Sequence, residues 1–106
     1  MKAKYWQKGE SLDYVNKTEK KIEHGDVVVL GNRVGIAGDD ILPGGTGAVH
    51  VTGVFEFVKS GTEEITVGTE VYYAESGVSL VGEVKVGYAA ADSSADNTKV
   101  FVKINA

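Results

Sequence analysis

The stretch DVVVLGNRVGIA, residues 26–37, contains the clearest fold signal in the chain. Residues 26–30 and residues 33–37 are both rich in β-branched side chains, and Gly31 and Asn32 separate them. Such side chains favour strands, and a two-residue connection that starts with glycine favours a type II′ hairpin turn. The stretch therefore predicts a β-hairpin whose first strand is buried on both faces or nearly so.

The longest alternating pattern follows at residues 48–58. Val49, Val51, Phe55 and Phe57 share one face of this run, because successive side chains of a strand point to opposite sides. Gly53 interrupts the run midway, which predicts a bulge or a sharp bend within one long strand.

Three shorter strand patterns lie toward the C-terminus, at residues 69–74, 83–91 and 99–104. In the last pattern Val100, Val102 and Ile104 are expected to point inward, with Lys99, Phe101 and Lys103 outward. The polar residues 92–97 are expected to form a hairpin loop before it.

Glycine supports the same interpretation, because its 14 copies mostly separate these β-rich runs. No segment of a dozen residues has the 3.6-residue spacing of an amphipathic helix. Short strands with turns every ~8–12 residues predict an all-β fold, a single compact sandwich or small barrel with little or no helix. We expect one domain, residues 1–106, with residues 1–12 as an N-terminal docking arm.

The charge of the chain is divided unevenly. Residues 1–24 carry six lysines against four acids, a net charge of +2, whereas residues 25–106 carry five basic and eleven acidic residues, a net charge of −6. Phosphate contacts need clustered Lys and Arg, so the acidic body predicts no nucleic-acid partner. No apolar run approaches the ~18 residues that cross a bilayer, so we expect no membrane partner. The opening MKAKYW reads as a mature N-terminus.

Motifs for catalysis, cofactors and metals are missing. The chain contains no cysteine, which excludes thiolate chemistry. The glycine-rich residues 44–49 lack the lysine and the following helix of a phosphate loop. His24 and His50, the only histidines, do not have metal-ligand spacing, and no nucleophile-elbow motif is present. We therefore predict no catalytic residue, no cofactor and no metal, and a protein that acts by binding.

Aromatic residues outside the apolar strand faces are the candidates for contact with a partner. Tyr5 and Trp6 lie in the N-terminal segment beside Lys2 and Lys4, and we expect these four residues to bind another protein chain. Phe101 points away from the apolar face of its strand. It therefore either completes a second layer of core or lies in an interface, and the same choice applies to Tyr72.

A second function stays open at this point. Trp6, Tyr72 and Tyr73 would suit a small β-barrel module that binds a ligand such as a carbohydrate without catalysis.

The order of these segments resembles that of phage capsid cement proteins, also called decoration proteins, a small tailed-phage family once described as a domain of unknown function. The resemblance extends over nearly the whole chain and is carried by an ordered set of segments rather than by one motif. These are YWQKGESLDYVN (5–16), IEHGDVVV (22–29), VGIA (34–37), DILPGGTGAV (40–49), VTGVFEF (51–57), GTEVYY (68–73), VGYA (86–89) and VFVKIN (100–105).

This resemblance implies a structural virion protein of a phage or prophage, made in the bacterial cytoplasm and placed on the outside of the capsid. It implies a sandwich or barrel with β-clip-like turns. Its partner would be the major capsid protein, whose neighbouring subunits it would bridge in the assembled shell. The arm of residues 1–12 could add a strand to a capsid sheet, with Tyr5 and Trp6 as anchors. We also expect the chain to form a homo-oligomer, a dimer or trimer.

Overall fold

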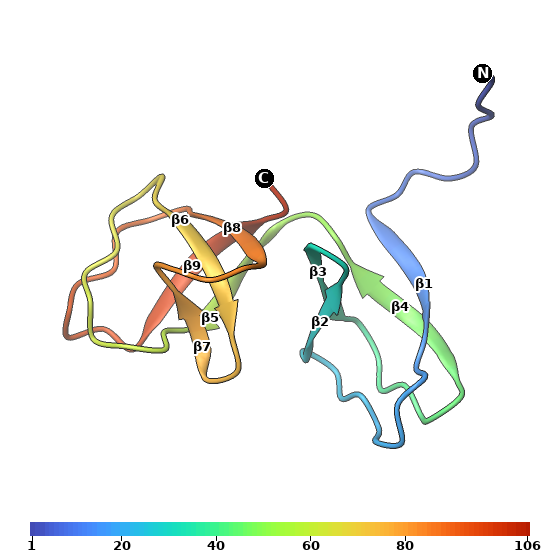
Figure 1. The fold of residues 1–106 in the computed structure, drawn as a ribbon, viewed down its shortest axis with the longest axis horizontal. Helices are drawn as coiled ribbons and strands as arrows, with labels where there is room; N and C mark the ends of the chain where they lie inside the picture. The colour runs from blue at the N-terminus through green and yellow to red at the C-terminus, as the bar shows by residue number, and fades with distance from the viewer.

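Nine short strands and no helix form the chain in the computed structural model, which describes all 106 residues (Figure 1). The strands are β1 (Ser11–Val15), β2 (Val27–Leu30), β3 (Arg33–Ala37), β4 (Thr46–His50), β5 (Val54–Val58), β6 (Glu70–Ala74), β7 (Gly77–Ser79), β8 (Lys85–Ala89) and β9 (Lys99–Ile104). The predicted all-β fold is confirmed. Nowhere does the chain form a helix with the length and apolarity that a membrane span requires.

Two antiparallel sheets lie next to each other (Figure 1). The smaller sheet has the strand order β1-β4-β3-β2, and the larger sheet has the order β5-β9-β8-β6-β7. The larger sheet curls until its two edges approach each other, and there the backbone N–H of Ser60 donates to the carbonyl of Val78 at 2.9 Å. The fold thus combines a two-sheet sandwich with a nearly closed barrel on one side.

The hairpin predicted at residues 26–37 is present as β2 and β3. Leu30 pairs with Arg33 across the turn, and Gly31 has the positive φ of 63° that a type II′ turn needs. The expectation that the first strand is buried on both faces is wrong. β2 is the edge of its sheet, whereas residues 34–37 of β3 are all buried. Both runs are β-branched, so composition alone does not distinguish the edge strand from the central one.

The alternating run at residues 48–58 belongs to two strands in different sheets, so the prediction of one long strand is wrong. The chain bends near Gly53, which has a φ of 119°, but there it crosses from β4 in one sheet to β5 in the other. Val49 and Phe57 are both buried, one in each strand. The alternation continues through the crossover because the odd-numbered residues point inward in both strands. The pattern therefore does not reveal the change of sheet.

β9 matches its prediction at every position. Val100, Val102 and Ile104 are buried, and the three residues between and before them are exposed. β8 pairs with β9, as the predicted hairpin requires. β1 and β7 were not predicted, because they lie in short segments without a clear alternation of apolar and polar residues.

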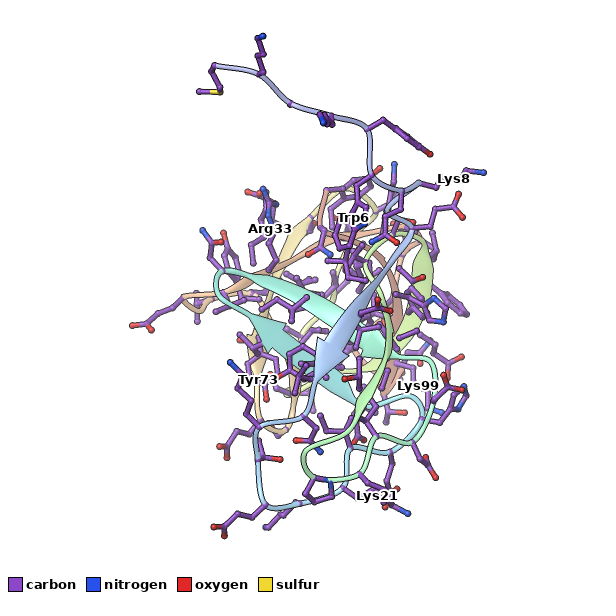
Figure 2. All side chains as sticks on the ribbon, turned by 90° about the vertical axis from the view of Figure 1, so that its right-hand side faces the viewer. Trp6, Lys8, Lys21, Arg33, Tyr73 and Lys99 are labelled. Atoms are coloured by element: carbon purple, nitrogen blue, oxygen red, sulfur yellow. The ribbon has the colours of Figure 1, made fainter.

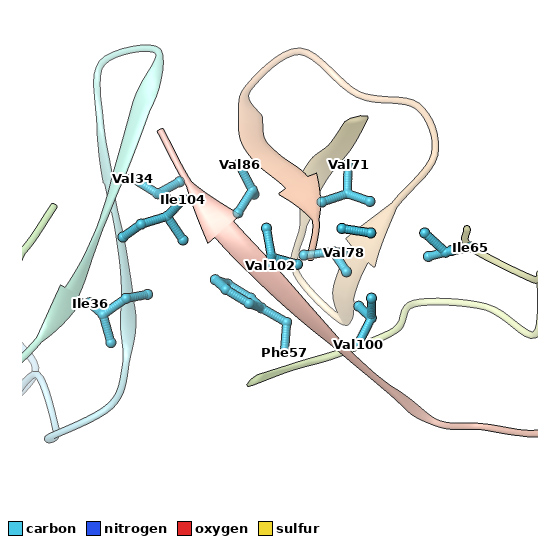
Figure 3. Packing of buried hydrophobic residues seen from close by; sticks show 11 residues of the cluster. Val34, Ile36, Phe57, Ile65, Val71, Val78, Val86, Val100, Val102 and Ile104 are labelled. Atoms are coloured by element: carbon cyan, nitrogen blue, oxygen red, sulfur yellow. The ribbon is translucent and has the colours of Figure 1, made fainter. Parts of the chain in front are cut away.

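The two sheets share one hydrophobic core (Figure 3). Val34 and Ile36 extend from β3 of the smaller sheet into a cluster formed by the larger sheet. The remaining members of this cluster are Phe57, Ile65, Val71, Val78, Val86, Ala89, Val100, Val102 and Ile104. On the other face of β3 a small cluster contains only Val28, Ile41 and Val49 as buried residues. The smaller sheet therefore buries part of its apolar surface against the larger sheet, through Val34 and Ile36.

Asn105 connects the two sheets by hydrogen bonds. Its Oδ1 accepts from the backbone N–H of Val34 at 3.1 Å, and its Nδ2 donates to the carbonyls of Val34 at 2.8 Å and Val51 at 2.9 Å. Its own N–H donates to the carbonyl of Val86 at 2.7 Å. The residue has a φ of 57°, a left-handed conformation that Asn tolerates better than most residues. The side chain thus takes the place of a strand neighbour for β3.

Replacement of Asn105 by glycine tests this connection without adding backbone strain, because glycine readily adopts a positive φ. We expect Asn105→Gly to lower the free energy of unfolding by about 1–3 kcal/mol, since three hydrogen bonds are lost and partly buried backbone groups stay unpaired. Urea unfolding measures the change. Asn32→Gly, at an exposed turn position, is the control, and an equal effect of the two substitutions would contradict the assignment.

Candidate protein-binding surfaces

The N-terminal arm is the first candidate surface, defined here as residues 1–10, which precede β1. Residues 1–7 take part in none of the hydrogen bonds or ion pairs of the chain, and the ribbon leads away from both sheets (Figure 1). Tyr5 and Trp6 are 86% and 81% exposed. Ser11 and Leu12, which the sequence assigned to the arm, belong to β1. The structure therefore places Lys2, Lys4, Tyr5 and Trp6 together on a free segment, and their role in binding stays a prediction.

The outer face of β5 and β9 is the second candidate surface. Val54, Glu56 and Val58 on β5 lie opposite Lys103, Phe101 and Lys99 on β9, respectively. Phe101 is 50% exposed, so the interpretation of this residue as part of a second core layer is wrong. Val54 and Val58 are also exposed and lie diagonally beside Phe101. An aromatic residue between two valines on an open sheet face is typical of a protein interface.

Charged residues surround this apolar group. Lys99 Nζ lies 3.0 Å from Glu56 Oε1, and Lys103 Nζ lies 5.9 Å from the ring centroid of Tyr88. Exposed ion pairs contribute little to folding, on the order of 0–1 kcal/mol. Charged side chains at the edge of an apolar group are also the arrangement found in the polar rim of a binding surface.

A groove between the two sheets is the third candidate surface. Its open volume is about 620 Å³, and it separates the edge strand β2 from the hairpin formed by β6 and β7. Val27 and Val29 line one side, and Tyr73 and Val78 line the other. The charged residues along it, Asp26, Glu56 and Glu75, are all acidic. The groove is therefore apolar at its walls and negatively charged.

The glycine-rich loop contributes to the fold and does not form a phosphate-binding site. The N–H groups of Gly44 and Gly45 donate to the carbonyls of Asn16 and Leu42, at 2.7 and 2.8 Å. A Cβ at Gly47 would lie 2.6 Å from Cγ1 of Ile41, so this glycine makes room for a core side chain. A phosphate cradle needs free N–H groups, which these two glycines do not offer.

Lys59 and Ser93 form a buried polar pair whose hydrogen bonds stabilise the fold. Lys59 Nζ donates to Ser93 Oγ at 3.3 Å and to the carbonyl of Ser94 at 2.9 Å, while Ser93 Oγ donates to the carbonyl of Lys99 at 2.7 Å. These bonds fix the loop of residues 90–98 against β5. No group of three or more His, Cys, Asp or Glu residues is arranged to hold a metal ion.

The aromatic residues suggested for carbohydrate binding do not form one platform. Tyr72 and Tyr73 are neighbours on β6 and point to opposite faces, and Tyr73 packs against the core. Figure 2 shows Trp6 and Tyr73 well apart from each other. No observation in the structure favours the carbohydrate-binding alternative.

Sequence analysis missed the contribution of Val54 and Val58 to the outer face. The signal was present, because both valines occupy even-numbered positions of a run whose even positions include His50, Thr52 and Glu56. Several apolar residues close together on an exposed face are a feature of interaction surfaces, whereas single ones are common.

Comparison with known proteins gives one finding. A family model described as phage cement protein matches residues 6–104 of the chain. Neither the curated proteins nor the solved structures give a match. The matched range begins at Trp6, so it includes β1 to β9 and part of the arm.

A pair of neighbouring substitutions tests the exposure of Phe101. We expect Phe101→Ala to change the free energy of unfolding by less than about 1 kcal/mol, as at most surface positions. Val102→Ala, one residue further on the buried face, should cost roughly 2 kcal/mol through lost burial and a cavity. Thermal and urea unfolding give both values, and a cost for Phe101→Ala as large as that for Val102→Ala would place the ring in the core.

Proposed function

The chain belongs to the phage cement protein family, and we propose that it stabilises the assembled capsid by binding across neighbouring major capsid subunits. Family membership makes it a capsid-associated virion protein. The bridging of subunits, the action by binding without catalysis, the homo-oligomeric state and synthesis in the host cytoplasm are parts of the proposal. The observation that carries it is the half-exposed apolar group on the outer face of the sheet. The buried polar groups of the domain, in contrast, serve folding.

The outer face of β5 and β9 is the surface that we assign to the capsid. It supplies an exposed aromatic anchor, Phe101, between Val54 and Val58. Anchors of this kind contribute much of the binding energy in protein interfaces. All five residues of β5 pair with β9, which also pairs with β8, so the face is part of the sheet and little conformational entropy is lost on binding.

Binding at this face stabilises a shell by mass action. A protein that binds the assembled lattice, but not the free subunits, shifts the equilibrium toward the lattice. A contact that extends over two subunits exists only after assembly, which supplies this selectivity. Many weak contacts repeated by the symmetry of the shell then add up to a large effect.

The arm is the second binding element of the proposal. We assign Lys2, Lys4, Tyr5 and Trp6 to contact with a neighbouring chain of the decorated shell. The absence of any intramolecular bond from residues 1–7 and the exposure of both aromatic rings support this assignment. A segment with backbone groups that are free of partners can pair with the edge of a sheet.

Charge placed on the outer face tests the capsid contact. We expect Phe101→Asp to weaken binding to undecorated capsid shells by at least about tenfold, since the substitution buries an unpaired charge in an apolar interface. Co-sedimentation of purified protein with shells measures the affinity, and unassembled capsid subunits should not bind.

Val81→Asp is the matched control, because Val81 is an exposed apolar residue in the loop between β7 and β8. Equal affinity of the two variants for shells would overturn the assignment of the face. The rise in the melting temperature of the shell on decoration should likewise be lost with Phe101→Asp and retained with Val81→Asp.

Removal of residues 1–9 tests the arm. We expect the truncated chain to keep its fold, because these residues contribute nothing to either core, and to bind shells more weakly through the loss of one of its two contacts. Circular dichroism checks the fold and co-sedimentation the affinity. Unchanged affinity and unchanged maximal decoration would contradict a role for the arm in the shell.

A further inference from the structure

From the charge and shape of the inter-sheet groove we infer that it is the binding site for the N-terminal arm of a second copy of this chain. The inference rests on the proposed function, in which the arm binds a neighbouring chain, and it names that chain. It would link cement proteins to one another on the shell, in addition to the link between each of them and the capsid.

The edge strand β2 offers backbone groups to the groove. β2 pairs only with β3, and the two-residue turn makes Leu30–Arg33 and Val28–Gly35 the hydrogen-bonded pairs of this hairpin. The N–H and C=O groups of Val27 and Val29 therefore point to the open side. An exposed edge of this kind is a template for one more strand. Because both valines also line the groove, an added strand would lie within it.

Charge indicates which segment fits. Asp26 and Glu75 take part in none of the ion pairs of the chain, and Glu56 is paired with Lys99 only. No Lys or Arg lines the groove. Residues 1–8 carry three lysines, Lys2, Lys4 and Lys8, and no acidic residue. The arm thus has the charge that the groove lacks, and complementary charge selects the partner and the orientation of an interface.

The length and side chains of the arm also fit. An extended strand rises about 3.4 Å per residue, so residues 2–6 cover about 17 Å, slightly more than the four residues of β2. Tyr5 and Trp6 are neighbours and point to opposite sides of an extended chain. Either register therefore places one aromatic ring against the apolar walls formed by Val29 and Tyr73.

The topology favours a second copy over the arm's own groove. The arm joins β1 at Ser11, whereas the groove lies along β2 at the opposite edge of the smaller sheet, and β1 lines the groove only with Tyr14, near its other end. Figure 1 shows the arm leaving on the side that faces away from the larger sheet. A contact from one edge to the other edge of the next copy joins two different surfaces, so copies linked in this way form a reciprocal pair, a ring or an open chain.

Disulfide trapping tests the contact directly, because the chain has no cysteine of its own. A tagged Lys4→Cys chain is mixed with an untagged Val29→Cys chain under mild oxidation. We expect a covalent dimer of one tagged and one untagged chain. Val81→Cys replaces Val29→Cys in the control, and that mixture should give at least about tenfold less mixed dimer, since random collisions are not held in place.

The double variant Lys4→Cys/Val29→Cys distinguishes a contact between two chains from a contact within one chain. A cross-link within one chain at low concentration would show that the arm folds onto its own groove and would overturn the inference. Mixed-dimer yield that is equal for Val29→Cys and Val81→Cys would overturn it as well.

The intact, unmodified chain provides an independent readout through Trp6, its only tryptophan. We expect the emission of Trp6 to shift to shorter wavelength as the protein concentration rises and the chain self-associates, because the indole leaves water. Asp26→Lys/Glu75→Lys should weaken this association by about tenfold through repulsion of the lysines. Glu83→Lys/Glu64→Lys, with the same change of charge outside the groove, should not.

Equal association of these two variants, or a chain that stays monomeric with unchanged emission up to about 1 mM, would contradict the groove contact. These measurements contain no capsid, so their failure is distinct from failure of the proposed function. Shell binding that depends on Phe101 together with a negative trapping result would leave the capsid role standing and remove only the arm exchange.

Discussion

The shared core at β3 is the interaction on which the rest of the structure depends. The smaller sheet's own cluster is small, with three buried apolar residues and four partly buried ones around them. Val34 and Ile36 supply further burial by packing into the larger sheet, and Asn105 adds hydrogen bonds across the same junction. Loss of this junction would therefore release the smaller sheet and, with it, the arm that begins at β1.

The junction also determines what the molecule can present to other chains. It joins the sheets along β3 but leaves β2 and the β6–β7 hairpin apart, so a groove stays open between them. The outer face of β5 and β9 lies on a strand pair in which β9 is also paired with β8. The structure thus presents two adjoining surfaces, one with an aromatic anchor and one with acidic residues, and Glu56 and Val58 of β5 belong to both.

In our proposals these two surfaces have different roles. The outer face would recognise the assembled capsid, and a face that is already ordered loses little entropy on binding. The groove would receive the arm of a neighbouring copy, selected by complementary charge. The arm, residues 1–10, has three lysines and one acid, whereas residues 11–106 have eight basic and fourteen acidic residues, so the uneven charge of the chain fits this arrangement.

The sequence by itself determined the all-β class, the hairpin at residues 26–37 and the inward residues of β9. It also singled out Lys2, Lys4, Tyr5 and Trp6, whose role in binding stays a prediction. Periodicity and turn chemistry are local, so they can be read along the chain. Only the tertiary structure decided that residues 48–58 change sheets and that β2 is an edge. It also decided that Phe101 faces solvent and that a groove lies beside β2. Each of these depends on contacts between residues far apart in the chain. A local sequence pattern does not show which other strand a given strand pairs with.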